Sequence, residues 1–226
     1  MTNWINVARA HLVGAMNFLG YPWLILALNF VIALVINQAI GGGLRSGELG
    51  AVYAAFLAMG VFAVVRWLPF TLALGVSRRS YFMGVALMAL AISVVDGLVL
   101  AALQALERAT GGWGASLHFF RVPYLLSGPW YLTWLTSFVL LAVFFVWGMW
   151  FGIVYRRWSV TGLVVFITAQ ILAIVAAVWI TTSAHAWHSF GHFFTTLSVE
   201  GLTGLLAILG IVLFGGGLAT MRRITV

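Results

Sequence analysis

The stretch Tyr81–Leu106, which reads YFMGVALMALAISVVDGLVLAALQAL, decides the fold. Asp96 is the single charged residue in this run, and it falls near the middle. About 20 mostly apolar residues are enough for a helix to cross the ~30 Å hydrocarbon core of a bilayer. The run therefore predicts a transmembrane helix, and its length leaves room for tilt.

Similar apolar runs lie on both sides of this stretch and are separated by short polar segments. The hydrophobic share of the chain is 64% and the charged share is 7%, where soluble domains carry ~25% charged residues. So few charges cannot cover the surface of a soluble enzyme of 226 residues. We expect an all-α integral membrane protein whose transmembrane domain, 19–226, has six spans, at 21–40, 50–65, 81–106, 130–154, 160–182 and 201–219.

Residues 1–18 precede the first span and have a different pattern. We expect them to form an amphipathic helix in the membrane interface rather than a cleavable signal peptide, since they lack a compact basic stretch before an apolar core. Apolar residues recur there at helical spacing, and polar residues fall near the opposite face: Trp4, Ala8, Leu12, Ala15 and Leu19 against Asn6, Arg9 and Asn17.

The arginines are distributed unevenly between the two sides of the predicted bundle. With the N-terminus in the cytoplasm, eight of the eleven basic residues lie on the cytoplasmic side, as the positive-inside rule requires. We therefore expect both termini to be cytoplasmic. This side bias also accounts for the net charge of +7, so nucleic acid is not an expected partner. The two groups are Arg9, Arg66, Arg78, Arg79, Arg156, Arg157, Arg222 and Arg223 inside, and Arg45, Arg108 and Arg121 outside.

Two residue types are missing from the sequence. Without cysteine the chain has no thiolate nucleophile and no sulfur-ligated metal site. Every basic residue is arginine, so the lysine of a Walker A loop is absent as well. If ATP drives this protein, another chain must bind it.

The connection at 66–80, between the second and third spans, is apolar and flanked by positive charge. Pro69 suits the first turn of a helix, Gly75 suits its C-terminal end, and Arg78 and Arg79 follow. Two interpretations stay open. The segment either continues the second span through a kink at Pro69, or forms a docking helix for a cytoplasmic subunit.

The sequence Leu74-Gly75-Val76-Ser77-Arg78-Arg79-Ser80, preceded by Pro69-Phe70 and placed between two spans, resembles the permease subunits of ABC transporters whose ATPase is a separate polypeptide. The layout of the chain is similar to type V ABC exporters. This resemblance implies a coupling segment at 66–80 that docks on the ATPase. The docking residues that it implies are Phe70, Thr71, Leu72, Leu74, Arg78 and Arg79.

The resemblance also implies partners and a location. ATP and Mg would be bound by separate ATPase subunits, and this chain would hold no cofactor and catalyse no reaction itself. A second permease, identical or related, would complete the pathway. We expect export of a hydrophobic or amphipathic substrate across a cell membrane, as in a bacterial inner membrane.

Polar residues inside the spans are candidates for a substrate pathway. Asp96 is the only acid within a span, and Asn29 and Asn37 form a polar stripe on the first span. Such side chains either line a pathway or hydrogen-bond to a neighbouring helix, and Asn29, Asn37 and Gln170 are possible partners for Asp96. An alternative function is an ATP-independent secondary transporter or channel in which Asp96 binds a proton or cation.

The predicted outer segment 183–198 contains three histidines at helical spacing, His185, His188 and His192. Imidazoles on one helix face can bind a transition metal. No carboxylate lies near them to orient the rings, and aromatic residues alternate with them, which favours a re-entrant or interfacial segment. We expect no metal there, although a structural or metal-binding membrane subunit is a further alternative.

Overall fold

The computed structural model describes residues 3–44, 49–120, 122 and 128–221. This part of the chain is helical and contains no strand, which confirms the all-α expectation. The helices are α1 (Asn3–Ala39), α2 (Gly50–Phe62), α3 (Leu68–Ala73), α4 (Arg78–Ala109), α5 (Trp130–Ser183), α6 (Trp187–Thr196) and α7 (Val199–Met221), with two π-helical turns, η1 (Ala63–Trp67) and η2 (Gly112–Ser116).

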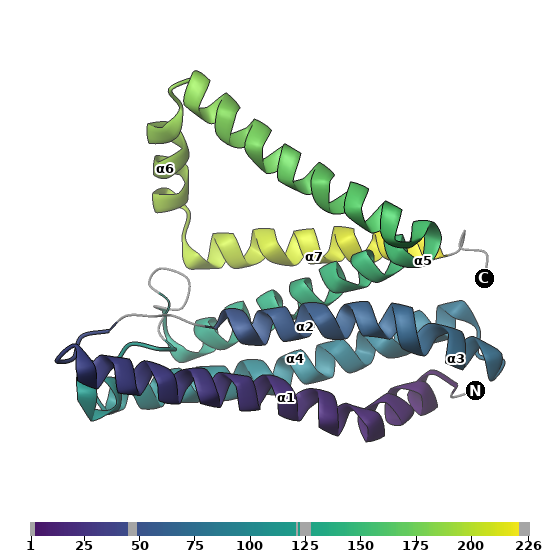
Figure 1. The fold of residues 1–226 in the computed structure, drawn as a ribbon, viewed down its shortest axis with the longest axis horizontal. Coiled ribbons are helices and arrows are strands. Elements are labelled where there is room, and N and C mark those ends of the chain that lie inside the picture. Colours follow the sequence, from purple (N-terminus) through teal and green to yellow (C-terminus); the bar gives the residue numbers. More distant parts are fainter. Residues whose placement is uncertain (1–2, 45–48, 121, 123–127, 222–226) are drawn as a thin grey trace.

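The helix α5 is 54 residues long and is bent sharply at one residue. A straight helix of that length would measure roughly 80 Å, far more than a ~30 Å hydrocarbon core. At Ser159 the backbone leaves the helical region, with φ 54° and ψ −153°, and Figure 1 shows α5 folding back on itself. We call 130–158 the first arm and 160–183 the second arm. The predicted spans at 130–154 and 160–182 fall within these two arms, and the crossing of a membrane by each arm stays a prediction.

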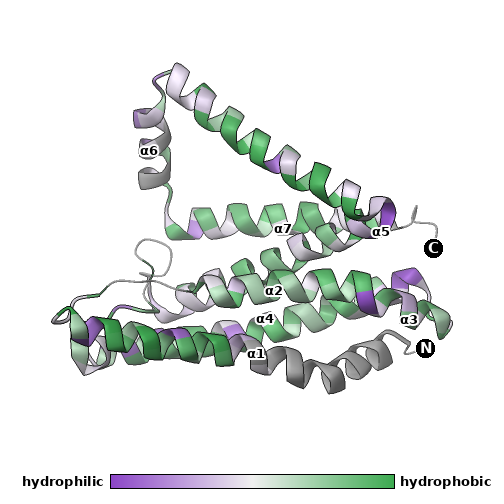
Figure 2. Ribbon diagram, viewed as in Figure 1, coloured by the Kyte–Doolittle hydropathy of each residue, from purple (hydrophilic) through white to green (hydrophobic). Residues whose placement is uncertain are grey.

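Five helical segments of the described chain are long and apolar enough to cross a membrane, and the bent α5 counts as one of them. Figure 2 shows these helices to be mostly hydrophobic along their length. The protein is therefore compatible with a multi-pass membrane protein. The number of six crossings and the side of each terminus remain predictions.

The predicted interfacial helix and the first span form one continuous helix, α1, which contains Pro22. Proline in a helix interior removes one backbone hydrogen bond, but no break separates the two segments. The side chains of residues 1–19 lie outside the described part, and so does the predicted amphipathic face.

The core of the molecule lies where α2, α4 and the first arm of α5 pack together. Glycines allow the backbones to approach closely, as is common between membrane helices. A Cβ atom at Gly60 would collide with the backbone of Phe145, and one at Gly148 would collide with the backbone of Leu57. The α2–α5 contact therefore depends on residues without side chains.

Beyond this core, the second arm of α5 stands apart (Figure 1). Its apolar residues are exposed on all faces, as Val164, Leu172 and Trp179 illustrate at 56%, 60% and 68% exposure. The short helix α6 then connects the arm to α7 and runs across the direction of α7 in Figure 1.

The two ends of the long helices differ in charge. In Figure 1, α3, the bend of α5, the start of α1 and the end of α7 lie at one end, which we call the α3 end. The opposite end, with η2 and α6, is called the α6 end. Among the described side chains, the α3 end carries Arg66, Arg78, Arg79, Arg156 and Arg157, and the α6 end carries Glu107, Arg108 and Glu200.

Candidate functional site

The segment 66–80 forms a corner at the α3 end. The π-helical turn η1 follows α2 without interruption and leads directly into α3. The hydroxyl of Tyr81, on α4, donates a hydrogen bond to the Ala63 carbonyl of this turn. The segment is therefore continuous with the second helix, through a π turn rather than a proline kink, and the docking interpretation stays a prediction.

The chain reverses direction after α3 at Gly75, the residue that the sequence predicts at the end of this helix. Gly75 has φ +80°, its N–H donates to the Leu72 carbonyl, and the Val76 N–H donates to the Thr71 carbonyl. Ser77 then caps α4, since its hydroxyl oxygen accepts from the Ser80 N–H at 3.2 Å. These contacts fix the direction in which the corner points.

Two large apolar side chains project from the corner into the surroundings. Phe70 is 58% exposed and Leu74 is 67% exposed. Their spacing of four residues places them on the same side of the turn. We call Phe70 and Leu74, together with the exposed Arg66 and Arg79 of the same segment, the exposed corner.

The other predicted docking residues are less accessible. Thr71 is buried, and its hydroxyl donates within the helix to the Trp67 and Leu68 carbonyls. Leu72 and Arg78 are half-buried. Of the six predicted docking residues, Phe70, Leu74 and Arg79 are therefore the ones that a partner can reach most directly.

Asp96 lies inside the helix bundle and is 4% exposed. The indole N–H of Trp23, on α1, donates to its Oδ1 at 3.3 Å. The hydrogen bond of Asp96 is thus made by Trp23 rather than by one of the possible partners Asn29, Asn37 and Gln170. This hydrogen bond links α1 to α4, as a polar side chain between membrane helices commonly does.

The polar stripe of α1 faces protein rather than lipid. Ala33 and Asn37 are buried, and Asn29 is half-buried. The Asn37 amide donates to the Ala115 carbonyl at 2.6 Å, and its oxygen accepts from the Leu44 N–H at 2.8 Å. Asn37 thus fastens the end of α1 to η2 instead of presenting a free amide.

Glu107 organises the α6 end, a role that the sequence did not reveal. It is 1% exposed, and its Oε2 accepts from the N–H groups of Phe119 at 3.0 Å and Phe120 at 2.8 Å and from the Trp113 indole at 3.3 Å. The ring of Phe30, on α1, packs against Trp113 and Phe119. The carboxylate therefore holds the loop after α4 over the bundle.

The predicted outer histidines lie on and before α6. His188 and His192 stack with ring centroids 6.5 Å apart, while His185 precedes the helix with φ 50°. No group of three histidine, aspartate or glutamate side chains in the described residues is arranged to hold a metal ion.

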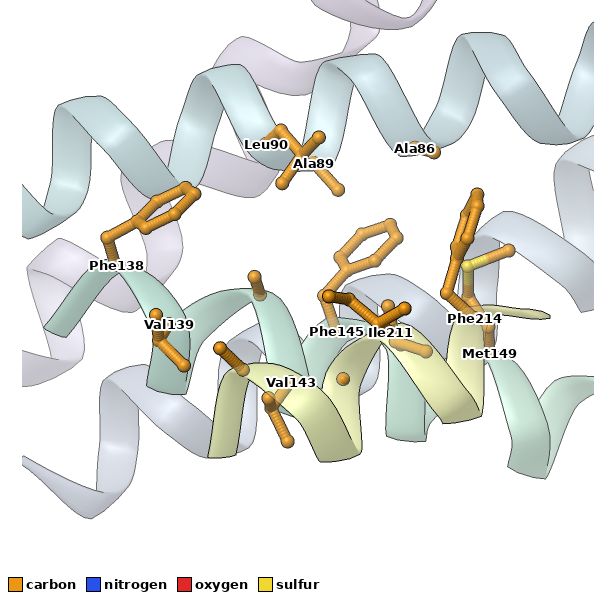
Figure 3. A pocket seen from close by; sticks show the side chains of 14 residues that line it. Ala86, Ala89, Leu90, Phe138, Val139, Val143, Phe145, Met149, Ile211 and Phe214 are labelled. Atoms are coloured by element: carbon orange, nitrogen blue, oxygen red, sulfur yellow. The ribbon is translucent and has the colours of Figure 1, made fainter. Parts of the chain in front are cut away.

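An apolar cavity of about 330 Å³ lies between α4, the first arm of α5 and α7 (Figure 3). The cavity is not enclosed, so apolar groups from the surroundings can enter it. Its lining consists of Ala86, Ala89, Leu90, Phe138, Val139, Ala142, Val143, Phe145, Val146, Met149, Ala207, Gly210, Ile211 and Phe214.

The fold and these sites define an all-helical protein with several long apolar helices, compatible with a multi-pass membrane protein. Comparisons with protein-family models, with curated proteins and with solved structures found no match for the chain.

Proposed function

We propose that this chain is the permease subunit of an ATP-driven ABC transporter and that it couples to separate ATPase subunits through the exposed corner. The observation that supports this proposal is the exposure of Phe70 and Leu74 at the end of a continuous helix. Exposed apolar side chains on a turn are typical of a surface that a partner protein covers.

The positive charge of the exposed corner indicates the chemistry of the partner surface that would bind it. Arg66 and Arg79, in the same segment as the apolar pair, would favour a cleft with an apolar floor and acidic walls. A rigid connection to α2 and α4 would let such a partner move both helices together. This is the mechanical requirement of a subunit that transmits ATP-driven closure into the membrane.

The remaining parts of the proposal follow from it. ATP and Mg are bound by the ATPase subunits, a second permease completes the pathway, and the substrate is hydrophobic or amphipathic and is exported. The complex resides in a cell membrane, as in a bacterial inner membrane. This chain itself is not an enzyme.

The first prediction concerns the exposed corner. The double substitution Phe70→Glu and Leu74→Glu places two carboxylates where an apolar contact with the ATPase is proposed. We expect co-purification of a P-loop ATPase with the tagged full chain from its native membranes to fall at least ten-fold. Quantitative mass spectrometry of the purified complex measures this change.

The matched control is Phe193→Glu, which changes the same residue type on α6, where Phe193 is 50% exposed. Its ATPase content should equal that of the unmodified chain. Equal ATPase content in the corner variant, or transport into liposomes by the chain without any ATPase, would contradict the proposal.

The alternative of a secondary transporter has less support. Asp96 is buried, and its described contact is with Trp23 on a neighbouring helix. A metal-binding subunit lacks a set of ligands within the described residues.

A further inference from the structure

We propose that the apolar cavity between α4, α5 and α7 is a binding site for one acyl chain of a bilayer phospholipid. This inference does not depend on the proposed transport function. Figure 3 shows side chains of α4 on one side of the cavity and side chains of α5 and α7 on the other.

The chemistry of the lining determines the class of ligand. None of the 14 lining residues has a side chain that can donate or accept a conventional hydrogen bond, and Met149 supplies the only side-chain atom other than carbon. A ligand with polar groups along its length would lose its hydration without gaining partners. The occupant is therefore a plain hydrocarbon.

The dimensions indicate a single chain. The lining residues of α5 run from Phe138 to Met149, over which the helix rises about 16 Å, so the lining is elongated along the helix. At about 30 Å³ for each group of water size, the cavity holds roughly ten methylenes.

The cavity is built into the packing of α7. At one end the hydroxyls of Thr136 and Thr203 hydrogen-bond at 2.8 Å, and at the other the Trp150 indole donates to the Leu213 carbonyl at 2.9 Å. These two contacts hold α7 against α5 on both sides of the cavity. Collapse of α7 into the space between them would break at least one.

The opening of the cavity faces the lipid. At the α3 end, the rings of Phe82 and Phe214 lie 4.8 Å apart and close the gap between α4 and α7. Among the lining residues, Leu90 is 46% exposed and Ile211 is 70% exposed. The route into the cavity that these two side chains border lies on the apolar surface of the bundle, where acyl chains are the solvent.

The test uses a phosphatidylcholine with a photoactivatable diazirine in the middle of one acyl chain. The full chain is reconstituted into phosphatidylcholine vesicles that contain this probe, and cross-linked peptides are identified by mass spectrometry. We expect labelling within 138–149 and 207–214. The variants Ala142→Phe and Ala207→Phe, which fill the cavity, should each reduce this labelling at least five-fold.

The matched control is Ala102→Phe, at an exposed position of α4 outside the lining, which should leave the labelling unchanged. Each variant is first shown to be monodisperse in detergent. If one of the two filled variants fails this check, the other is used alone, and if both fail, Ala86→Leu, a smaller change on α4, replaces them.

Two results would overturn the inference. One is equal labelling of the cavity peptides in the filled variants and the unmodified chain. The other is a second copy of this chain covering the opening of the cavity. It would be detected as disulfide formation between two Ile211→Cys chains in vesicles. Since the natural sequence has no cysteine, such a disulfide would report this position alone. Neither assay contains an ATPase, so failure here leaves the proposed function untouched.

Discussion

Single polar residues hold distant parts of this apolar chain together. Trp23 contacts Asp96, Asn37 contacts Ala115, and Glu107 binds three donors of the following loop. Hydrocarbon offers no replacement partner for a buried polar group, so the loss of one of these contacts is costly.

Removal of the Glu107 carboxylate should destabilise the α6 end. In Glu107→Ala, the N–H groups of Phe119 and Phe120 lose their acceptor, at about 1–3 kcal/mol for each unsatisfied buried donor. We expect a lower unfolding temperature in detergent and faster proteolysis between α4 and α5. Glu107→Gln keeps an oxygen and should have a smaller effect.

The control is Glu200→Ala, because Glu200 is exposed in the first turn of α7. Equal unfolding temperatures for Glu107→Ala and Glu200→Ala would show that the observed hydrogen bonds contribute nothing.

At the scale of the element, close packing of α2 on α5 depends on glycine. A Cβ at Gly148 would overlap the Leu57 backbone, so Gly148→Ala must separate the two helices. Overpacking of this kind costs about 1–3 kcal/mol. A lower unfolding temperature in detergent is therefore expected for Gly148→Ala, measured by thermal denaturation.

The comparison variant is Gly204→Ala on α7, where an added Cβ meets no atom within 4 Å. It should be neutral or slightly stabilising, because alanine favours the helix. An equal loss of stability in both variants would mean that the α2–α5 contact is not responsible.

The sequence predicted the elements better than their contacts. Pro69 and Gly75 correctly marked the beginning and end of a short helix, because both residues act on the local backbone. The partner of Asp96 was missed, since Trp23 is far away in the chain and only amide side chains were considered as partners from the sequence. Thr71 was placed among the docking residues by the resemblance, and its burial follows from the packing of α3, which the sequence does not show.

The cavity could not be predicted for a related reason. Its lining comes from three helices, and each contributes alanine, valine or phenylalanine that could equally face lipid. Only the positions of two interhelical hydrogen bonds, Thr136 to Thr203 and Trp150 to Leu213, reveal that α7 is held across a gap.

At the scale of the whole molecule, the described arginines gather at the α3 end and predict that this end is cytoplasmic. The cysteine-free chain allows a direct test with a membrane-impermeant maleimide on intact cells. Ser189→Cys, on α6, should be labelled from outside, whereas Ala73→Cys, on α3, should be labelled only after the cells are permeabilised. The opposite pattern would reverse the orientation, and labelling of both in intact cells would contradict the three crossings predicted between them, because an odd number of crossings places the two residues on opposite sides.

Because the bend of α5 lies at Ser159 alone, a small rotation at this residue would move the far end of the second arm over a much larger distance. The arm extends about 36 Å from its pivot at 1.5 Å per residue, so a rotation of about 10° there moves its far end by roughly 6 Å. A change in the torsion angles of one residue is thus amplified into a displacement larger than a helical turn. Because α6 joins the end of the arm to α7, the same small rotation would also pull on the last helix.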